Sequence, residues 1–346
     1  MKRWRLSVPS LLAGLLALFG QLPLVSGAQP QVPAGVRSFV NYRGLEKMAM
    51  VTVSVSNRTA SSQLQVHRDL VYGKAGLASL KLDLYVPPRI RGSLRPAVIF
   101  IHGGGWAMGD KGDCHEAETL AGYGFVTANI NYRLCWLSKF PAQVEDCKAA
   151  VRYLRFHAAR LGVDPARIGV WGASAGGHLA MMLGCADARA GMEGSSGPRN
   201  VSSRVQAVCS YFGPTDLAGE FANPLTLGGQ IVHFFMGPFR PPQDFVKASP
   251  IAHVSRDDPP LLMVHGDSDW LVPIRHSERM LLAYRQVGVE ANLLRVSNAD
   301  HGFMPKDFRK PVQPSETQRM AAVAGFFNRH LRRAPRPISV ALAPQQ

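Results

Sequence analysis

Residues 172–176 have the sequence Gly-Ala-Ser-Ala-Gly, which places a serine between residues with little or no side chain. The apolar segment 168–171 precedes them, and small apolar residues typical of a helix follow from Ala175 to Leu183. A sharp turn from a strand into a helix has no room for larger side chains, and it exposes the serine hydroxyl at the edge of a sheet. We therefore predict that Ser174 is a nucleophile on a strand-to-helix turn.

Apolar segments that alternate with helical patterns predict the rest of the sheet. Alternation of strands and helices of this kind is typical of an α/β fold with a mostly parallel central sheet and helices on both faces. The stretch 215–258 is far longer than a usual connection, so we expect a small cap insertion there. Strands are expected at 80–86, 97–101, 125–130, 168–171, 205–212, 261–264 and 293–296, and helices at 143–161, 175–183 and about 318–331.

The first 28 residues have the pattern of a secretory signal peptide. Basic residues at the start precede an apolar run over residues 11–24, and Ser26-Gly27-Ala28 provides small residues for cleavage near Ala28. The run is too short for a spanning helix, so we expect an exported protein without stable membrane insertion. The remaining divisions are expected to be a lead-in at 29–65, a catalytic domain at 66–332 and a Pro-rich tail at 333–346.

Charge and cysteine content limit the possible partners. The net charge is +15, but the basic residues are scattered and accompany no nucleic-acid motif, so we expect a generally basic surface and no nucleic-acid partner. The cysteine spacings match no metal site, which predicts that the protein holds no metal. An odd count leaves at least one thiol unpaired, and the sequence does not reveal the pairing of Cys114, Cys135, Cys147, Cys185 and Cys209.

A second glycine-rich segment, His102-Gly103-Gly104-Gly105-Trp106, follows the expected strand 97–101. Consecutive glycines let the backbone approach a substrate, and their N–H groups together with that of Ala175 would form an oxyanion hole. A turn that binds nothing is the alternative, whereas a phosphate loop would require a following Gly-Lys-Ser/Thr. We expect His102 to orient this loop.

A serine nucleophile requires a histidine base and an orienting carboxylate, and in this kind of fold the chain order is serine, acid, histidine. Asp267 and Asp269 both follow the expected strand 261–264, so either could be the acid. His301 lies in a Gly-flanked loop directly after the expected strand 293–296. We therefore predict that His301 is the base.

Five motifs together resemble the esterases of the α/β-hydrolase superfamily. They are His-Gly-Gly-Gly-Trp, Asn131-Tyr132-Arg133-Leu134, Gly-Ala-Ser-Ala-Gly-Gly-His, Phe212-Gly213-Pro214-Thr215-Asp216 and Gly-x-x-Asp-x-x-Val-Pro. The sequence is most similar to the bacterial feruloyl-esterase-like (BD-FAE-type) and hormone-sensitive-lipase-like branches, over about residues 67–331. Cys135-Trp136-Leu137 departs from the latter branch, whose members often have Ala-Pro-Glu there.

The resemblance implies an α/β-hydrolase fold and assigns roles to individual residues. Asp269 would be the triad acid, with Asp267 in a turn or supporting position, and the oxyanion donors would be Gly104, Gly105 and Ala175. We expect a carboxylic ester hydrolase that needs no cofactor and acts through a covalent acyl-enzyme. Its substrates would be small or aromatic esters, with feruloyl, acetyl or short-chain acyl groups, free or linked to polysaccharide.

Two other functions and one structural question remain open at this point. A serine exopeptidase of the same fold would share the same motifs, and a catalytically inactive binding protein would share the fold. The apolar residues of the cap insertion could line a substrate pocket or pack the cap on the core. The candidates for the pocket are Trp106, Phe234 and Phe235.

Overall fold

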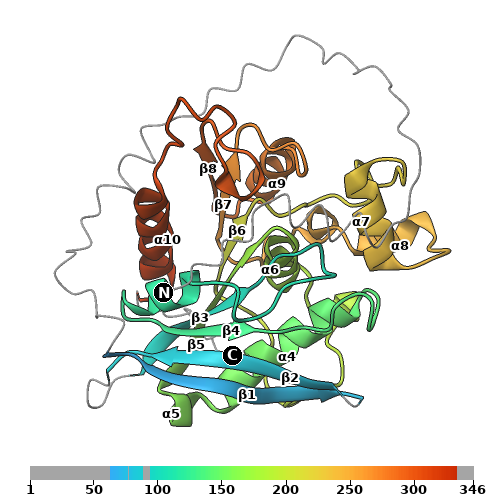
Figure 1. Cartoon of the computed structure of the whole chain (residues 1–346). Helices are drawn as coiled ribbons and strands as arrows, with labels where there is room; N and C mark the ends of the chain where they lie inside the picture. The colour runs from blue at the N-terminus through green and yellow to red at the C-terminus, as the bar shows by residue number, and fades with distance from the viewer. Residues whose placement is uncertain (1–62, 77, 89–93, 333–346) are drawn as a thin grey trace, which may run out of the picture. The chain divides into compact units, whose positions relative to one another are not determined.

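The computed structural model describes residues 63–76, 78–88 and 94–332. The predicted signal peptide, nearly all of the lead-in and the Pro-rich tail lie outside these residues. Within them, eight strands form one sheet in the order β1-β2-β4-β3-β5-β6-β7-β8 (Figure 1). The strands are β1 (Gln65–Ala75), β2 (Ala78–Val86), β3 (Arg95–Ile101), β4 (Val126–Ile130), β5 (Val163–Ala173), β6 (Ala207–Tyr211), β7 (Leu261–Gly266) and β8 (Ala291–Val296).

Strands β3 to β8 pair in parallel with one another. At one side of the sheet, β2 pairs antiparallel with both β4 and β1. Helices cover both faces, so the predicted α/β-hydrolase fold is confirmed. The helices are α3 (Glu116–Ala121), α4 (Ala142–Phe156), α5 (Ala158–Leu161), α6 (Ala175–Cys185), α7 (Leu227–Met236), α8 (Pro242–Lys247), α9 (Arg275–Gln286) and α10 (Glu316–Leu331), with short 3₁₀ helices η3 (Ala188–Ala190), η4 (Pro250–His253) and η5 (His301–Phe303).

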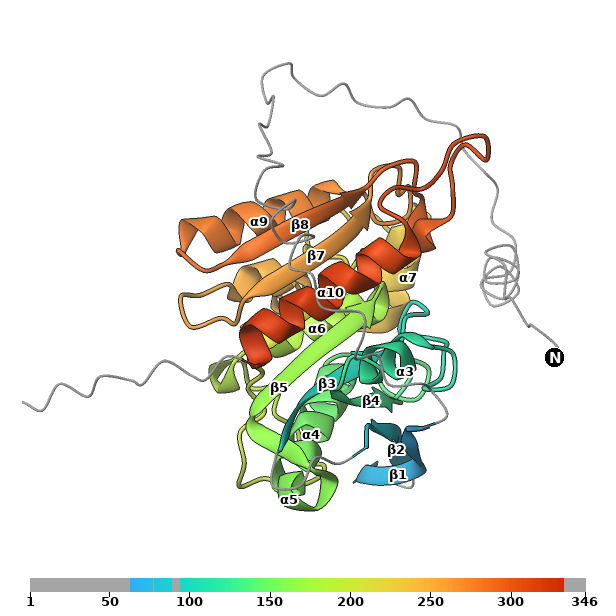
Figure 2. The same cartoon turned by 90° about the vertical axis from the view of Figure 1, so that its left-hand side faces the viewer.

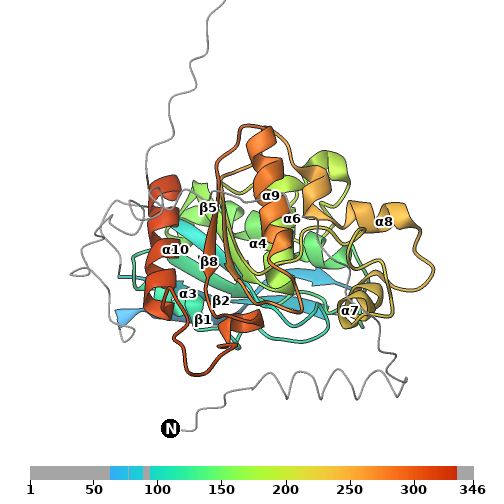
Figure 3. The ribbon, with the colours of Figure 1, turned by 90° about the horizontal axis from the view of Figure 1, so that it is seen from above.

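Helices α3 and α10 lie on one face of the sheet, and α4, α6 and α9 lie on the other (Figures 2 and 3). The continuous apolar run of β3 is explained by this arrangement, because a parallel strand covered on both faces has no side that faces water. Phe327 of α10 packs with Trp171 of β5 in a core cluster that also includes Phe100 of β3. The helices on the two faces together bury the middle of the sheet.

The carboxyl ends of the parallel strands meet at one edge of the sheet, and the predicted site residues follow several of them. The long connection between β6 and β7 carries α7, α8 and η4, and it corresponds to the predicted cap insertion. Among the described residues, no helix is long and apolar enough to cross a membrane. All five cysteines are unpaired, and only Cys114 is partly exposed.

Candidate active site

Ser174 occupies the turn between β5 and α6 with φ 55° and ψ −119°. This positive φ is strained for a residue with a side chain, and strain of this kind is concentrated at functional sites. The flanking glycines are sterically required. A Cβ on Gly172 would lie 2.2 Å from the carbonyl oxygen of Gly176, and a Cβ on Gly176 would lie 2.1 Å from that of Ile101.

His301 lies between Ser174 and Asp269. Its Nε2 is 3.0 Å from Ser174 Oγ, and its Nδ1 is 2.8 Å from Asp269 Oδ2. The backbone N–H of His301 donates to Asp300 Oδ1 at 2.7 Å, and the ring of Phe212 packs edge-on against the imidazole at 4.7 Å. The structure therefore brings together three side chains that are separated by up to 127 residues of sequence.

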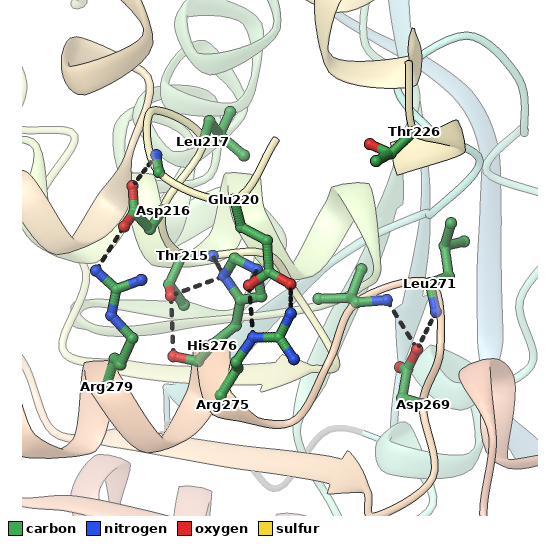
Figure 4. Close-up of polar contacts among 12 residues, drawn as sticks. Thr215, Asp216, Leu217, Glu220, Thr226, Asp269, Leu271, Arg275, His276 and Arg279 are labelled. Carbon is green, nitrogen blue, oxygen red and sulfur yellow. Dashed lines mark hydrogen bonds and ion pairs between the residues drawn. The ribbon is translucent and has the colours of Figure 1, made fainter. Parts of the chain in front are cut away.

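Asp269 is buried, and its second carboxylate oxygen, Oδ1, also accepts hydrogen bonds. Oδ1 accepts the backbone N–H groups of Leu271 at 3.0 Å and Val272 at 2.8 Å (Figure 4). Burial alone would raise the pKa of Asp269, but hydrogen bonds from His265 and His301 outweigh it and lower the pKa to about 2. Asp267 is exposed and hydrogen-bonded to Ser268. Of the two candidate carboxylates, it is therefore Asp269 that faces His301.

His265 is a residue of this site to which the sequence analysis assigned no role. It is fully buried, and its Nε2 lies 3.3 Å from Asp269 Oδ2 and 2.7 Å from the carbonyl oxygen of Val272. Its Nδ1 lies 2.7 Å from Ser277 Oγ. His265 thus fixes the loop that presents the carboxylate. Its position four residues before Asp269, at the end of a buried strand, is the signal that could have identified it.

The glycine loop after β3 lies directly against the turn that carries Ser174. A Cβ on Gly103 would meet the carbonyl oxygen of Ala173 at 2.9 Å. Gly104 and Gly105 have φ values of 98° and 58°, which explains why these two positions are glycine. Among the described residues, none accepts a hydrogen bond from the backbone N–H of Gly104, Gly105 or Ala175. These three donors are therefore available to a ligand.

His102 begins this loop and is buried beneath it. Its ring stacks on Tyr132 with centroids 4.3 Å apart, and its Nδ1 lies 2.8 Å from the carbonyl oxygen of Gly103. The Tyr132 hydroxyl donates to the carbonyl oxygen of His102 at 3.2 Å. Burial lowers the pKa of His102, so the ring is neutral at pH 7. These contacts agree with an orienting role for His102.

The three candidate pocket residues differ in their surroundings. Phe235 of α7 is fully buried and stacks on Trp106, with centroids 4.3 Å apart. Trp106 is also buried and donates its indole N–H to His178 Nδ1 at 3.3 Å. Phe234 is half-buried, with the ammonium group of Lys139 4.0 Å from its ring centroid. The contacts of Phe235 and Trp106 favour packing of the cap on the core.

Polar contacts also attach the start of the cap insertion to α9 (Figure 4). Asp216 forms an ion pair with Arg279 at 2.6 Å, and Glu220 accepts the Nε–H of Arg275 at 2.9 Å. The ring of His276 stacks on Phe221 with centroids 5.0 Å apart. Because α9 follows the loop that carries Asp269, the cap is anchored to the element next to the acid.

An arrangement of this kind is able to carry out acyl transfer. It combines a strained serine, a histidine in contact with both the serine and a buried carboxylate, and free backbone donors. Within the described part of the chain, no group of three or more His, Cys, Asp or Glu residues could hold a metal ion.

The BD-FAE family model matches residues 82–283, which is more than half of the chain. The chain belongs to the BD-FAE family. The chain is also 31% identical over 225 residues to the probable carboxylic ester hydrolase LipM of Mycobacterium tuberculosis. That match covers 63% of this chain and 52% of LipM. The chain spans about half the length of the curated relatives that it matches.

Solved structures of esterases have the same fold as this BD-FAE family member. A truncated carbohydrate esterase from gut microbiota is similar with a TM-score of 0.67 and 28% identity, over 80% of this chain and all of that one. Esterase 2 of Thermogutta terrifontis with bound propionate is similar with a TM-score of 0.64 and 28% identity, over 78% of this chain and 95% of that one. The same esterase has been solved phosphorylated by paraoxon.

Proposed function

We propose that this protein is a carboxylic ester hydrolase with a Ser174-His301-Asp269 triad. The observation that carries the proposal is the line of contacts from Ser174 Oγ through the His301 ring to Asp269 Oδ2, at 3.0 and 2.8 Å. Free backbone donors beside the serine support the same reaction. The names of the relatives and of the structural neighbours describe ester hydrolases as well.

In the proposed reaction, Ser174 Oγ attacks the ester carbonyl carbon while His301 Nε2 accepts the hydroxyl proton. The N–H groups of Gly104, Gly105 and Ala175 stabilise the oxyanion, an interaction typically worth ~10²–10³ in turnover per donor. The alcohol leaves with the proton from His301. Water then attacks the acyl-enzyme with His301 as base again, which releases the acid and restores Ser174.

Asp269 has an orienting role in this reaction. Its Oδ2 accepts the proton on His301 Nδ1, which leaves Nε2 as the acceptor for the serine proton. The pKa of about 2 keeps Asp269 ionised through the neutral range, so it also stabilises the imidazolium ion that forms during each attack. The bonds from Leu271 and Val272 to Oδ1 hold the carboxylate in place.

The proposed substrates are small or aromatic esters, free or attached to carbohydrate. The structural neighbours named as a carbohydrate esterase and as an esterase with bound propionate support a short acyl group and a sugar-linked alcohol. The feruloyl group is a further member of the proposed class, in line with the family to which the chain belongs.

The proposal is tested by comparing wild type with Ser174→Ala on p-nitrophenyl acetate, p-nitrophenyl decanoate, methyl ferulate and an aminoacyl p-nitroanilide. We expect ester cleavage by wild type and a loss of about 10⁶-fold in the variant. Ser268→Ala is the matched control, because it changes a serine whose hydroxyl donates to Asp267 and not to His301 or Asp269. We also expect paraoxon to inactivate wild type.

Wild-type ester activity in the Ser174→Ala variant would refute the assignment of the nucleophile. Cleavage of the anilide alone would indicate a serine exopeptidase of this fold. No activity on any of the four substrates would favour a binding protein.

We also propose that the protein is exported after cleavage near Ala28. The basic start, the apolar run and the small residues at 26–28 support this proposal. N-terminal sequencing of protein recovered from outside the producing cells would test it, because a mature chain that begins at residue 29 is expected.

A further inference from the structure

The loop that carries His301 continues into a segment of mixed apolar and basic character. Residues 304–310 have the sequence Met-Pro-Lys-Asp-Phe-Arg-Lys, and we call them the 304–310 loop. The side chain of Phe308 is 81% exposed and that of Met304 is 47% exposed. Lys306, Arg309 and Lys310 are exposed on either side of Phe308. Large apolar side chains thus face water within a basic segment.

The exposure of Phe308 is imposed by the hydrogen bonds of its own loop. Asn298 Nδ2 donates to the carbonyl oxygens of Asp307 and Lys310, each at 2.8 Å, and Asn298 Oδ1 accepts the backbone N–H of Asp307 at 2.8 Å. Pro305 forms an isolated bridge with Ala299. One asparagine side chain therefore holds the turn on both sides of Phe308 and keeps the ring away from the core.

A tryptophan on the loop that carries Asp269 is also exposed. Trp270 is 51% exposed, and its backbone N–H donates to Asp300 Oδ1 at 3.3 Å. The backbone N–H of Asp300 in turn donates to the carbonyl oxygen of Met304 at 2.8 Å. Asp300 therefore connects the backbone of Trp270 to the backbone of Met304. Trp270, Met304 and Phe308 are thus exposed on two loops that Asp300 joins, and Asp300 directly precedes His301.

The charges of the loop are largely unneutralised. Among the described residues, no carboxylate lies within ion-pair distance of Lys306 or Arg309, and Lys310 is 3.9 Å from Asp307. Three basic residues and one acidic residue leave the segment with a net charge of 3 − 1 = +2. Asp300, which directly precedes His301, accepts the N–H groups of His301 and Trp270. The loop therefore presents positive charge around its apolar tip.

We propose that the 304–310 loop, together with Trp270, docks on an anionic lipid surface. The transfer of phenylalanine and methionine side chains from water to the boundary between headgroups and acyl chains is favourable, and tryptophan prefers the same depth. Lys306, Arg309 and Lys310 would lie at the level of the lipid phosphates, where each basic residue adds to the attraction. An acidic polysaccharide would pair with the charges but would leave Phe308 and Met304 in water.

The docked state is peripheral and reversible, because one loop and one tryptophan bury little area compared with a spanning helix. It would bring the edge of the sheet that carries Ser174 toward the lipid. Lipid binding by this loop does not depend on the proposed ester hydrolysis, so the two proposals can fail separately.

The test is co-sedimentation of the full chain with phosphatidylcholine vesicles that contain or lack phosphatidylglycerol. A Ser174→Ala background prevents hydrolysis of the lipids during the assay. We expect binding that is stronger on the anionic vesicles and weaker at high salt. Phe308→Ser should weaken it at least about tenfold on anionic vesicles. Lys306→Gln and Arg309→Gln should each weaken it about fivefold, and only where phosphatidylglycerol is present.

Phe156→Ser is the matched control, because it removes a phenylalanine that is 59% exposed at the end of α4. Figure 2 shows α5, which follows α4 directly, at the opposite end of the sheet from the loop after β8. This control should bind as tightly as the parent. In otherwise wild-type chains, Phe308→Ser and Lys306→Gln should retain the melting temperature and the rate on p-nitrophenyl acetate.

The proposal is overturned if the parent binds neither type of vesicle, or if Phe308→Ser binds as the parent does. It is also overturned if Phe156→Ser loses binding equally. Binding to polygalacturonate without binding to vesicles would show that the partner is an acidic polysaccharide. If Phe308→Ser does not fold, the salt dependence and the two charge variants decide the question.

Discussion

The turn that carries Ser174 and the cap insertion are held to the rest of the fold in different ways. At the turn, backbone packs against backbone. A single added carbon on Gly176 would lie 2.1 Å from the carbonyl oxygen of Ile101 and 2.5 Å from that of His102. The backbone atoms around each glycine therefore require a glycine there, independently of the surrounding side chains.

The cap insertion contacts the core mainly through side chains. Phe235 stacks on Trp106, Phe221 stacks on His276, and Asp216 pairs with Arg279. Each of these contacts requires two residues that are distant in sequence, and many other pairs would serve equally well. Local sequence therefore specifies the geometry of the turn but not the attachment of the cap. Changes at the turn and at the proposed triad should act on the rate, and changes at the cap should act on stability.

The largest effect is expected for Asp269→Asn. The variant cannot accept the proton on His301 Nδ1 as the carboxylate does, which favours the wrong tautomer of the base, and kcat for p-nitrophenyl acetate should fall ~10⁴-fold. Asp267→Asn is the control, since Asp267 is exposed and its carboxylate accepts a hydrogen bond from the Ser268 hydroxyl. A larger loss of rate in Asp267→Asn than in Asp269→Asn would mean that the catalytic acid has been misassigned.

A smaller effect, on stability, is expected for Phe235→Ala. Removing a fully buried ring that contacts Trp106, Phe140 and His178 should lower the free energy of unfolding by about 3–5 kcal/mol. Phe239→Ala removes the same ring from a fully exposed position in the cap and should change stability by less than about 0.5 kcal/mol. Urea denaturation of both variants measures the difference.

The same two variants address the role of the cap in substrate selection. If Phe235 only packs the cap, the ratio of rates on p-nitrophenyl acetate and p-nitrophenyl decanoate should stay as in wild type. A shifted ratio with unchanged stability would instead indicate that Phe235 lines the acyl pocket.

The contrast between the two regions also explains what the sequence could predict. The strands predicted at 97–101 and 261–264 are present, because continuous apolar runs are typical of parallel strands covered on both faces. β1 was not predicted. Its first five residues are exposed and it pairs only with β2, so it has no clear apolar alternation.

The residues of the candidate active site also divide into those that a local sequence pattern marks and those that it does not. A local pattern marks Ser174, His301 and the glycine loop, and the structure places these three features together. The choice between Asp267 and Asp269 required the family resemblance, because both follow the same strand at nearly the same position. His265 and Glu220 were not assigned a role, because their contacts depend on how α9 and the cap pack, which no local pattern shows.

The smallest effect concerns Glu220, where two substitutions separate charge from hydrogen bonding. Burial lowers the pKa of His276 to about 3, so the ring is neutral at pH 7. Its Nδ1 accepts the backbone N–H of Thr215 at 3.3 Å, which places the ring proton on Nε2, 3.1 Å from Glu220 Oε2. The contact of His276 with Glu220 therefore involves a neutral ring, whereas that of Arg275 with Glu220 is an ion pair at an exposed position.

Glu220→Gln keeps an oxygen near His276 and removes only the charge that pairs with Arg275. Because exposed ion pairs contribute little, it should lower the free energy of unfolding by less than about 1 kcal/mol, and high salt should reduce the difference. Glu220→Ala also removes the oxygen near His276, but Nε2 of His276 is buried without a hydrogen-bond partner among the described residues even in the wild type, so the further cost should be small. A loss in Glu220→Ala that is larger by about 1–3 kcal/mol and insensitive to salt would contradict this expectation and would show that His276 does hydrogen-bond to Glu220.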